Sequence, residues 1–260
     1  MFLQLVGAMV YYDGMHNDAR MNVSLALTAA GYGAVVTNHT EVLSLLKTKK
    51  EDGTEVCSGV KVRDTVSGEV FDVKAKGVVN ATGPFTDAIR QMDDPSVKNI
   101  VAPSAGVHII LPDYYSPRSM GLLDPETSDG RVIFFLPWEN STIAGTTDTK
   151  TEVTANPRPR EEEVDWILGE VKHYLSPDVQ VRRGDVMAAW SGIRPLVYDP
   201  NKKNTESIAR NHIVHVSPSK LVTVSGGKWT TFRAMAQHTL DEAVKEFGVR
   251  RSHCVLYVTN

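Results

Sequence analysis

The sequence predicts a mixed α/β fold of the α+β kind, in which strands that run into helices share the chain with a larger antiparallel sheet. Three observations predict it. Apolar, β-branched runs at residues 77–79 and 221–224 each pass through glycine into a helical pattern, as strand–turn–helix units do. Residues 41–75 alternate with period two around turn signals. From residue 101 onward, strand patterns are separated by loops rich in Pro, Asp, Ser and Gly, which favours an antiparallel sheet.

Composition excludes several classes of protein. The chain has 260 residues, 42% of them hydrophobic and 23% charged, which is ordinary for a globular protein. Its formal net charge of −3 gives no support to nucleic-acid binding. The two cysteines, Cys57 and Cys254, form neither a disulfide framework nor a metal-type pair, which fits a reducing compartment. No apolar run approaches the roughly 20 residues of a spanning helix, and residues 1–10 lack the basic flank of a targeting segment.

The first hundred residues predict a helix and a β-meander. The expected elements are a helix at 19–30, strands at 34–36, 41–47, 56–63 and 69–75, and a buried strand at 77–80 that leads into a helix starting at Pro84.

The remaining chain predicts the antiparallel sheet and the closing unit. The expected elements are strands at 105–111, 131–138, 141–147, 186–190, 207–216 and 221–225, and helices at 161–175 and 232–247. No internal repeat interrupts this order.

The stretch Ser225-Gly-Gly-Lys-Trp-Thr-Thr231 is the strongest candidate for a binding site. It joins a strand to a helix, so unpaired backbone N–H groups and the positive end of the helix dipole point to one place. Gly226 and Gly227 allow close approach to the backbone, Lys228 adds a positive charge, and Thr230 and Thr231 stand in the first turn. The stretch therefore indicates a cradle for an anionic or electron-rich group, and a plain glycine turn with threonine caps remains the alternative. It is not a P-loop.

A second strand–glycine–helix junction occurs at Asn80-Ala-Thr-Gly-Pro84. Such junctions at the carboxyl ends of parallel strands are where α/β sheets bind cofactors. A tight structural turn around Thr82 and Gly83 is the alternative. Two junctions in one chain favour a shared ligand.

Three further side chains are candidates for chemistry. Arg194, held extended by Pro195 at the end of a strand, could fork onto a phosphate or carboxylate. Arg210 lies between β-type residues and could face a sheet-lined pocket, or equally the solvent. His108 is the one polar residue of an apolar strand, which is typical both of a hydrogen-bonded core histidine and of a general base on a rigid element. No set of residues has the spacing of a metal site, since His212 and His215 fall on opposite strand faces.

Taken together, the sequence resembles the FAD-dependent glycerol-3-phosphate dehydrogenase family, in its mitochondrial branch. The similarity runs from about residue 3 to residue 247. The motifs that carry it are Tyr12-Asp-Gly with Asn17-Asp-Ala-Arg20, Val79-Asn-Ala-Thr-Gly-Pro84, Ala105-Gly-Val-His108, Gly121-Leu-Leu-Asp-Pro125, Phe135-Leu-Pro-Trp138, Ile143-Ala-Gly-Thr-Thr-Asp148, Trp190-Ser-Gly-Ile-Arg-Pro195 and Ser225-Gly-Gly-Lys-Trp-Thr-Thr231.

The resemblance implies a reaction and a fold. The reaction is the oxidation of sn-glycerol 3-phosphate to dihydroxyacetone phosphate by FAD, with electrons passed to ubiquinone at the inner mitochondrial membrane. The fold is a glutathione-reductase-like FAD domain with an antiparallel substrate domain, as in D-amino-acid oxidase. A peripheral membrane attachment and a homo-oligomer are compatible with it.

The resemblance also implies roles for the candidate residues. His108 is the base for the C2 hydroxyl, and Arg194 and Arg210 hold the substrate phosphate. Lys228 and the helix start behind it stabilise reduced flavin. The residues that line FAD are Val42, Thr82, Gly83, Gly226, Gly227, Lys228, Thr230 and Thr231.

The sequence departs from the family at its ends. The fingerprint G-x-G-x-x-G occurs nowhere, and the family's C-terminal domain has no counterpart after residue 247. We therefore expect a partial FAD-binding domain at 1–100 with an inserted β-meander, a substrate domain at 101–215, a closing strand and helix at 216–247, and a divergent tail at 248–260. Two alternatives stay open: a non-catalytic isoform that binds a phosphate ligand or a partner subunit, and a flavin amine or amino-acid oxidase of the same fold.

Overall fold

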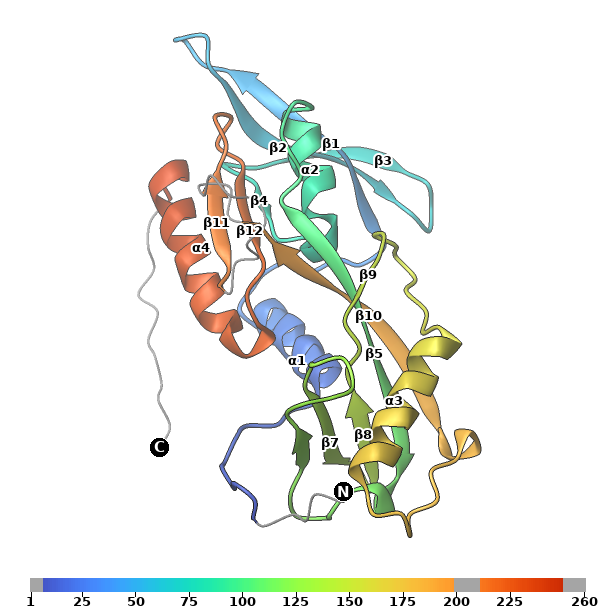
Figure 1. Cartoon of the computed structure of the whole chain (residues 1–260). Coiled ribbons are helices and arrows are strands. Elements are labelled where there is room, and N and C mark those ends of the chain that lie inside the picture. Colours follow the sequence, from blue (N-terminus) through green and yellow to red (C-terminus); the bar gives the residue numbers. More distant parts are fainter. Residues whose placement is uncertain (1–6, 199–210, 250–260) are drawn as a thin grey trace.

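The computed structural model describes residues 7–198 and 211–249, which form three sheets and the helices around them (Figure 1). The largest sheet is antiparallel, with strand order β10-β5-β8-β7-β6 and β9 paired to β5. Its members are β5 (Val101–Pro112), β6 (Leu122–Asp124), β7 (Ile133–Trp138), β8 (Ser141–Gly145), β9 (Thr149–Lys150) and β10 (Ala188–Val197).

One face of this sheet carries the main hydrophobic core. Helix α3 (Glu161–Tyr174) covers it, because its apolar residues recur at helical spacing and meet every second residue of β5. Val107, Ile109 and Leu111 are fully buried there against Val164 and Ile167. The alternate residues of β5 therefore point to the opposite face, which holds His108.

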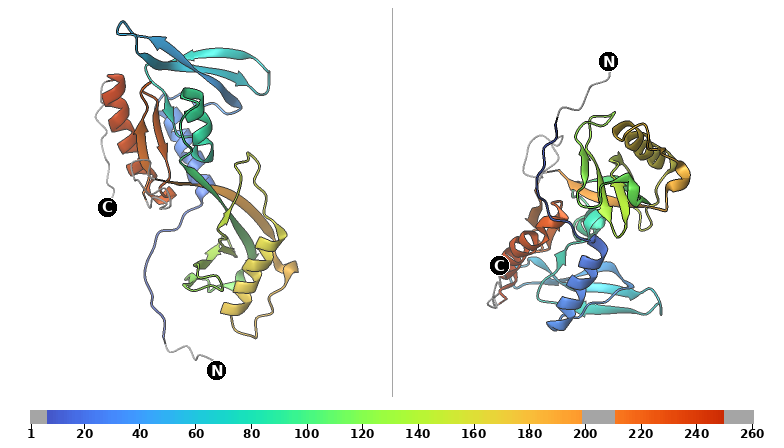
Figure 2. Two further views of the ribbon diagram at one scale, coloured as in Figure 1. Left: turned by 45° about the horizontal axis from the view of Figure 1, so that its top comes forward. Right: turned by 90° about the horizontal axis from the view of Figure 1, so that it is seen from below.

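A second sheet has the order β11-β12-β4, from β11 (Ile213–Val216), β12 (Val222–Ser225) and β4 (Val79–Asn80). β12 and β4 are parallel, and each leads through glycine into a short 3₁₀ turn and then a helix. The first path runs through η1 (Gly83–Phe85) to α2 (Thr86–Asp93), and the second through η4 (Trp229–Thr231) to α4 (Phe232–Phe247). In Figure 2 the long strands β5 and β10 of the large sheet extend from the part covered by α3 toward the sheet of β4, β11 and β12.

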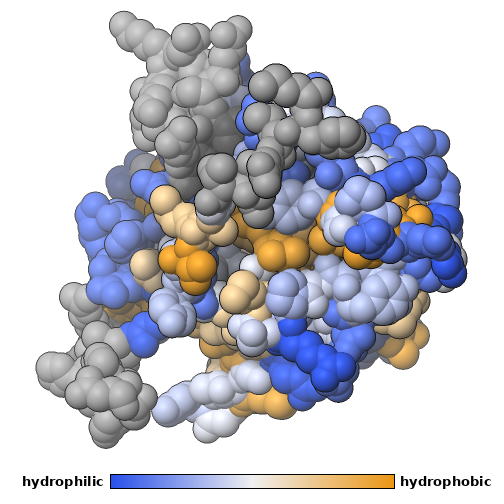
Figure 3. Space-filling model, turned by 60° about the horizontal axis from the view of Figure 1, so that its bottom comes forward, coloured by the Kyte–Doolittle hydropathy of each residue, from blue (hydrophilic) through white to orange (hydrophobic). Residues whose placement is uncertain are grey.

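The third sheet is the predicted meander β1 (Thr40–Lys49), β2 (Glu55–Asp64) and β3 (Val70–Lys74). Helix α1 (Asp18–Gly31) precedes it and buries none of its own residues. Seen from below, apolar side chains interrupt the polar surface in several places (Figure 3). Among the described residues, no helix combines the length and the apolar character needed to cross a bilayer.

The fold class and most elements are confirmed, but several strands differ from their expected bounds. The strand expected at 105–111 runs from Val101 to Pro112, and the described part of the one expected at 207–216 begins at Ile213. Residues 34–36 form no strand, because Val35 is 92% exposed and the run has no partner to pair with. The strand expected at 141–147 ends at Gly145, and the one expected at 186–190 runs from Ala188 to Val197. The strands β6 and β9, of three and two residues, were too short to show a periodicity. Of the strand expected at 207–216, residues 207–210 lie outside the described part.

Candidate active site

The pairing of β5 with β10 brings His108 and Arg194 to one face of the large sheet. His108 lies opposite Trp190, and Arg194 lies opposite Ser104. Directly opposite residues of antiparallel strands point to the same face, and so do residues two and four apart on one strand. Arg194 is thus a residue of the strand interior, where its position is more rigid than at the strand end that the sequence predicted.

The His108 ring is held between two neighbours. It stacks on Trp190 with ring centroids 5.7 Å apart and planes within 16°. On the neighbouring strand β8 the ring lies over Gly145, where a Cβ atom would come within 2.6 Å of the imidazole. Glycine at that position leaves room for the imidazole.

The electrostatics keep His108 neutral. Burial lowers the pKa of His108 below 6.5, and the Arg194 guanidinium lowers it further, while Asp18 on α1 opposes the shift. A histidine with a lowered pKa is uncharged at neutral pH, so it can accept a proton. The geometry thus supports the general-base interpretation of His108.

Arg194 is anchored by the segment that follows β8. Its Nη1 donates to the carbonyl of Thr147 at 3.1 Å, and its Nη2 donates to Thr146 Oγ1 at 2.9 Å. Asp148 Oδ1 and the carbonyl of Ala105 lie at 3.5 Å from Nη1. The Nε–H has no partner among the described residues. A guanidinium has five N–H donors, so one edge remains for an anion.

The two glycine junctions lie side by side. Thr86, which follows Gly83, donates from its hydroxyl to Ser225 Oγ at 3.4 Å. Because β4 and β12 are parallel neighbours, their carboxyl ends open at the same edge of the sheet. This arrangement is consistent with the sequence-based expectation that the two junctions share one ligand.

The glycines of the two junctions differ in their surroundings. Gly226 and Gly227 have φ of +78° and +76°, and a Cβ would come within 2.5 Å of Val197 and 2.8 Å of Met235 respectively. Packing within the protein therefore requires both. Gly83, with φ of +57°, has nothing within 4 Å of its Cβ position, which leaves open space above it.

The short turn that leads into α4 presents hydrogen-bond donors to solvent. Lys228, Thr230 and Thr231 are exposed. The backbone N–H groups of Lys228, Trp229 and Thr230 donate to no residue that the structure describes, as expected at the beginning of a helical turn. These donors are compatible with the cradle that the sequence predicts, and binding of an anionic group there stays a prediction.

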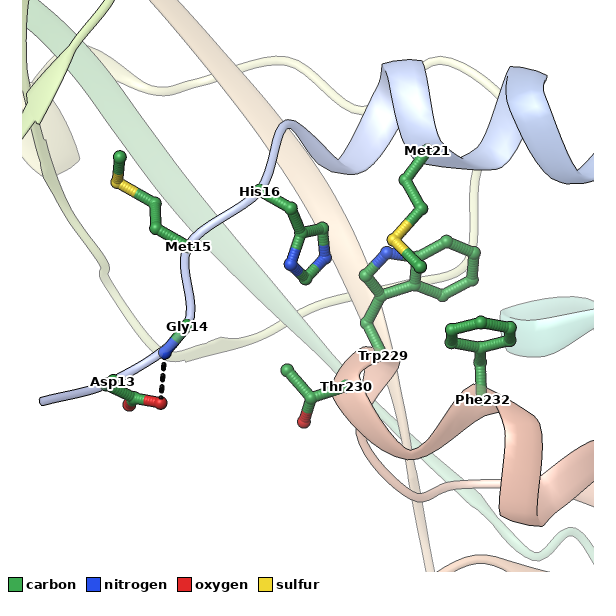
Figure 4. Close-up of a pocket in the computed structure, with 8 residues that line it drawn as sticks. All are labelled: Asp13, Gly14, Met15, His16, Met21, Trp229, Thr230 and Phe232. Carbon is green, nitrogen blue, oxygen red and sulfur yellow. Dashed lines mark hydrogen bonds between the residues drawn. The ribbon is translucent and has the colours of Figure 1, made fainter. Parts of the chain in front are cut away.

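A cavity of about 320 Å³ lies where this turn meets the segment before α1 (Figure 4). Trp229, Phe232 and Met21 form an apolar wall, and Thr230 and His16 add polar atoms. His16 Nε2 is buried and lies 3.2 Å from the Asp18 carboxylate in a geometry that makes no hydrogen bond. The cavity thus lies between the turn at residues 229–232 and the segment that leads into α1.

Of the remaining predicted site residues, one lies in another sheet and one is outside the described part of the chain. Val42 is half-buried in the meander, opposite Val62 of β2, in a different sheet from His108 and from the junctions. Arg210 lies outside the described residues. The structure therefore brings together His108 and Arg194 on one face, and the Thr82, Gly83 and Gly226 positions at one edge.

Sequence reasoning missed some of the residues that shape the site. Trp190 and Asp148 were quoted in motifs, and no role followed from them. A partner for His108 could have been found by aligning the two strands, since a tryptophan opposite a histidine is a common stacking pair. The effect of Asp18 on the pKa of His108 depends on how α1 packs in three dimensions, and no local sequence pattern shows this packing.

A parallel strand pair with two glycine junctions lies beside an antiparallel sheet that presents a histidine and an arginine, and α/β sheets bind cofactors at such strand ends. The family model described as FAD dependent oxidoreductase (DAO) matches residues 2–241, and the chain belongs to this family.

Individual relatives are more specific. The chain is 64% identical over 243 residues to the mitochondrial glycerol-3-phosphate dehydrogenase of Mus musculus, which covers 93% of this chain and 33% of that protein. It is 53% identical over 241 residues to the mitochondrial glycerol-3-phosphate dehydrogenase of Arabidopsis thaliana, covering 93% of this chain and 38% of that protein. The chain thus spans between 33% and 38% of the length of these two relatives.

Solved structures agree in fold. The glycerol-3-phosphate dehydrogenase of Bacillus halodurans, complexed with FAD, superposes with a TM-score of 0.75 at 31% identity, covering 90% of this chain and 44% of that one. Glycine oxidase from Geobacillus kaustophilus superposes with a TM-score of 0.58 at 20% identity over 88% of this chain and 54% of its own, which shows the shared fold alone.

Proposed function

We propose that this chain carries the substrate side of an FAD-dependent enzyme that oxidises sn-glycerol 3-phosphate to dihydroxyacetone phosphate. The observation that carries the proposal is a neutral His108 on the same sheet face as Arg194, whose Nε–H has no partner among the described residues. Oxidation of an alcohol next to a phosphate needs a base for the hydroxyl proton and a cation for the phosphate. The names of the relatives, which are 64% and 53% identical, support the same substrate.

The residues present fit part of an FAD site. The open space over Gly83 and the N–H groups at residues 228–230, which have no acceptor in the described part of the chain, would receive the flavin. Lys228 would counter the negative charge that develops on it. Within this proposal, the layer of β4, β11 and β12 belongs to the FAD domain and the six-stranded sheet to the substrate domain. FAD supplies the acceptor for the hydride that leaves C2.

The chain's own residues would act as follows. Arg194 binds a phosphate oxygen through its free edge and so fixes the position of C2, and Arg210, as implied by the family resemblance, is a second phosphate ligand. His108 accepts the proton of the C2 hydroxyl as the C–H bond breaks. The stacked Trp190 keeps the imidazole from rotating away from the hydroxyl.

The electron acceptor and the location follow from the same resemblance. We infer that electrons leave to ubiquinone, and that the protein acts in mitochondria at the periphery of the inner membrane. The relatives named as mitochondrial enzymes support the compartment.

The test is a spectrum and an assay of the purified 260-residue chain. A bound-flavin absorbance band after reconstitution with FAD, together with dye reduction that depends on sn-glycerol 3-phosphate, would support the proposal. A chain that retains flavin but reduces dye with glycine, and not with the phosphate, would favour an amino-acid oxidase. A chain with neither band nor turnover would exclude the enzymatic proposal for this form.

A further inference from the structure

Arg194 is held by a loop that has its own anchor on the other face of the sheet. The loop, residues 146–148, follows β8 and supplies Thr146 Oγ1 and the Thr147 carbonyl to the guanidinium. The guanidinium lies over Gly106, where a Cβ would come within 2.5 Å of Nη2. Its position therefore depends on where the loop is fixed.

We propose that Thr147 and Glu163 are positioning residues for Arg194, and that through Arg194 they set the affinity for the substrate phosphate. The second half of this statement rests on the proposed function. The first half concerns this chain alone and can be tested without turnover.

The Thr147 side chain is fully used in holding the loop. Its hydroxyl oxygen accepts from the backbone N–H of Val107 at 2.9 Å, and its O–H donates to Glu163 Oε1 at 3.0 Å. Thr147 is 2% exposed and Glu163 6% exposed. Buried polar groups that are all paired fix a single arrangement, and the arrangement is lost when one partner is removed.

Glu163 is a charged anchor on α3. Burial alone would raise the pKa of Glu163, but hydrogen bonds from Arg160 and Thr147 outweigh burial and lower it. Arg160 Nε donates to Glu163 Oε2 at 3.1 Å, and the Arg160 backbone N–H lies at 3.3 Å from the same oxygen. A carboxylate held from two sides at the first turn of a helix is a fixed point for the Thr147 hydroxyl.

Two further contacts hold the same loop. Ser104 Oγ donates to Asp148 Oδ1, and Arg131 Nη1 donates to the Asp148 carbonyl at 3.0 Å. The path from Glu163 through Thr147 to Arg194 is therefore continuous and rigid. Loss of the Thr147 hydroxyl would free the carbonyl that Arg194 Nη1 uses.

The test compares Thr147→Val, which keeps the shape and removes the hydroxyl, with Thr147→Ser, which keeps the hydroxyl. Glu162→Gln, an exposed neighbour in the same helical turn, is the matched control. Glu163→Gln is the second variant, and replaces Thr147→Val if the latter does not fold. The readouts are the His108 titration by NMR and the KM for sn-glycerol 3-phosphate, with kcat measured separately.

We expect Thr147→Val to raise KM by ~10-fold with kcat changed less than about twofold, since misplacement of a binding group by about 1 Å costs up to ~10²-fold. In the same variant the pKa of His108 should rise toward 6.5, because Arg194 no longer stays close to it. Thr147→Ser and Glu162→Gln should resemble the wild type in both readouts. Glu163→Gln should move both in the direction of Thr147→Val.

An unchanged His108 titration in folded Thr147→Val or Glu163→Gln, when Arg194→Gln does shift it, would overturn the positioning role. An unchanged KM in an active enzyme would do the same. If the wild-type chain shows no turnover with sn-glycerol 3-phosphate, the proposed function fails, and the titration alone decides the inference.

Discussion

His108 owes its chemistry to its surroundings. In water a histidine titrates near 6.5, whereas here burial and the Arg194 charge hold the neutral form, with Asp18 acting in the opposite sense. Protonation of His108 in the folded protein therefore requires a pH below its ordinary range. We expect the rate of substrate oxidation to be constant above the lowered pKa and to fall as the pH drops through it.

Substitution of the two charged neighbours should shift this titration in opposite directions. Arg194→Gln removes a repulsive charge, so the pKa of His108 should rise, and Asp18→Asn removes an attractive one, so it should fall. NMR titration of the His108 ring measures both shifts. Identical titrations in the two variants would show that neither charge acts on the ring.

Arg194→Gln should also weaken the substrate complex. Loss of one charge-assisted hydrogen bond to a phosphate costs roughly 1.5–3 kcal/mol of binding free energy. Calorimetry of the reconstituted protein with sn-glycerol 3-phosphate measures it. Arg183→Gln, in an exposed ion pair with Glu161 on the far side of α3, should leave the affinity unchanged.

At the scale of elements, the turn after β12 is determined by packing. Gly226 has φ of +78° and touches Val197 of β10, so Gly226→Ala combines an unfavourable conformation with a clash. We expect a loss of ~2–4 kcal/mol in the free energy of unfolding, measured by urea denaturation.

Gly83→Ala and Gly169→Ala are the matched controls. Gly83 has a positive φ and free space around its Cβ position, so only the conformational cost of ~1–2 kcal/mol applies. Gly169 lies in α3 with nothing within 4 Å, so alanine there should stabilise the protein by up to ~1 kcal/mol. Equal effects of Gly226→Ala and Gly83→Ala would contradict the packing argument.

Most elements could be predicted from the sequence, because their periodicities are strong. The meander, α1, α3 and α4 follow from alternation, caps and apolar stripes, and the structure confirms them within one or two residues. The end of β10 could not be predicted, because Pro195 suggests a strand end. A proline lacks the N–H that an inner strand needs for pairing, but β10 is an edge strand and continues to Val197. The three-residue β6 carries no readable period.

At the scale of the whole molecule, a polar cluster around the buried Asp93 joins the β1–β3 meander, helix α2 and the turn between β11 and β12. Lys47 of β1 pairs with Asp93 at the end of α2 at 2.9 Å, and Ser219, in the turn before β12, donates to Asp93 Oδ1 at 2.5 Å. Cys57 Sγ of β2 lies 3.3 Å from Ser219 Oγ. The meander is therefore tied to α2 and to the β11–β12 turn through one carboxylate.

Asp93→Asn should destabilise the fold at neutral pH by roughly 1.5–3 kcal/mol, because the Lys47 ammonium and the Ser219 hydroxyl lose a charged acceptor that is itself buried. Burial would raise the pKa of Asp93, but hydrogen bonds from Ser217, Ser219 and Lys47 lower it below 3.8 overall. Its contribution is therefore present above pH 3.8 and lost as the pH falls further. The difference between variant and wild type in urea denaturation should shrink in that acidic range.

Asp72→Asn is the control for this prediction, since Asp72 forms a half-exposed pair with Lys61. It should change the stability by less than ~1 kcal/mol. A pH-independent effect of Asp93→Asn would show that the carboxylate charge is not what holds the cluster.

The site itself could be predicted only in part. Local motifs indicated His108, Arg194 and the two glycine junctions, because strand ends and glycine turns are visible in the sequence. The contacts that give these residues their properties come from chain segments far apart, such as the 40 residues between Val107 and Thr147. These contacts are determined by the tertiary fold and leave no pattern in the local sequence.

The most direct test of the account is the rate at which sn-glycerol 3-phosphate bleaches the flavin band under anaerobic conditions, in wild type and in His108→Ala. We predict rapid bleaching in the wild type and a rate ~10² to 10⁴ times lower in His108→Ala, with the flavin still bound, as for a lost general base. Bleaching at the same rate in both proteins would show that His108 does not take the proton, and absence of bleaching in the wild type would contradict the proposed reaction.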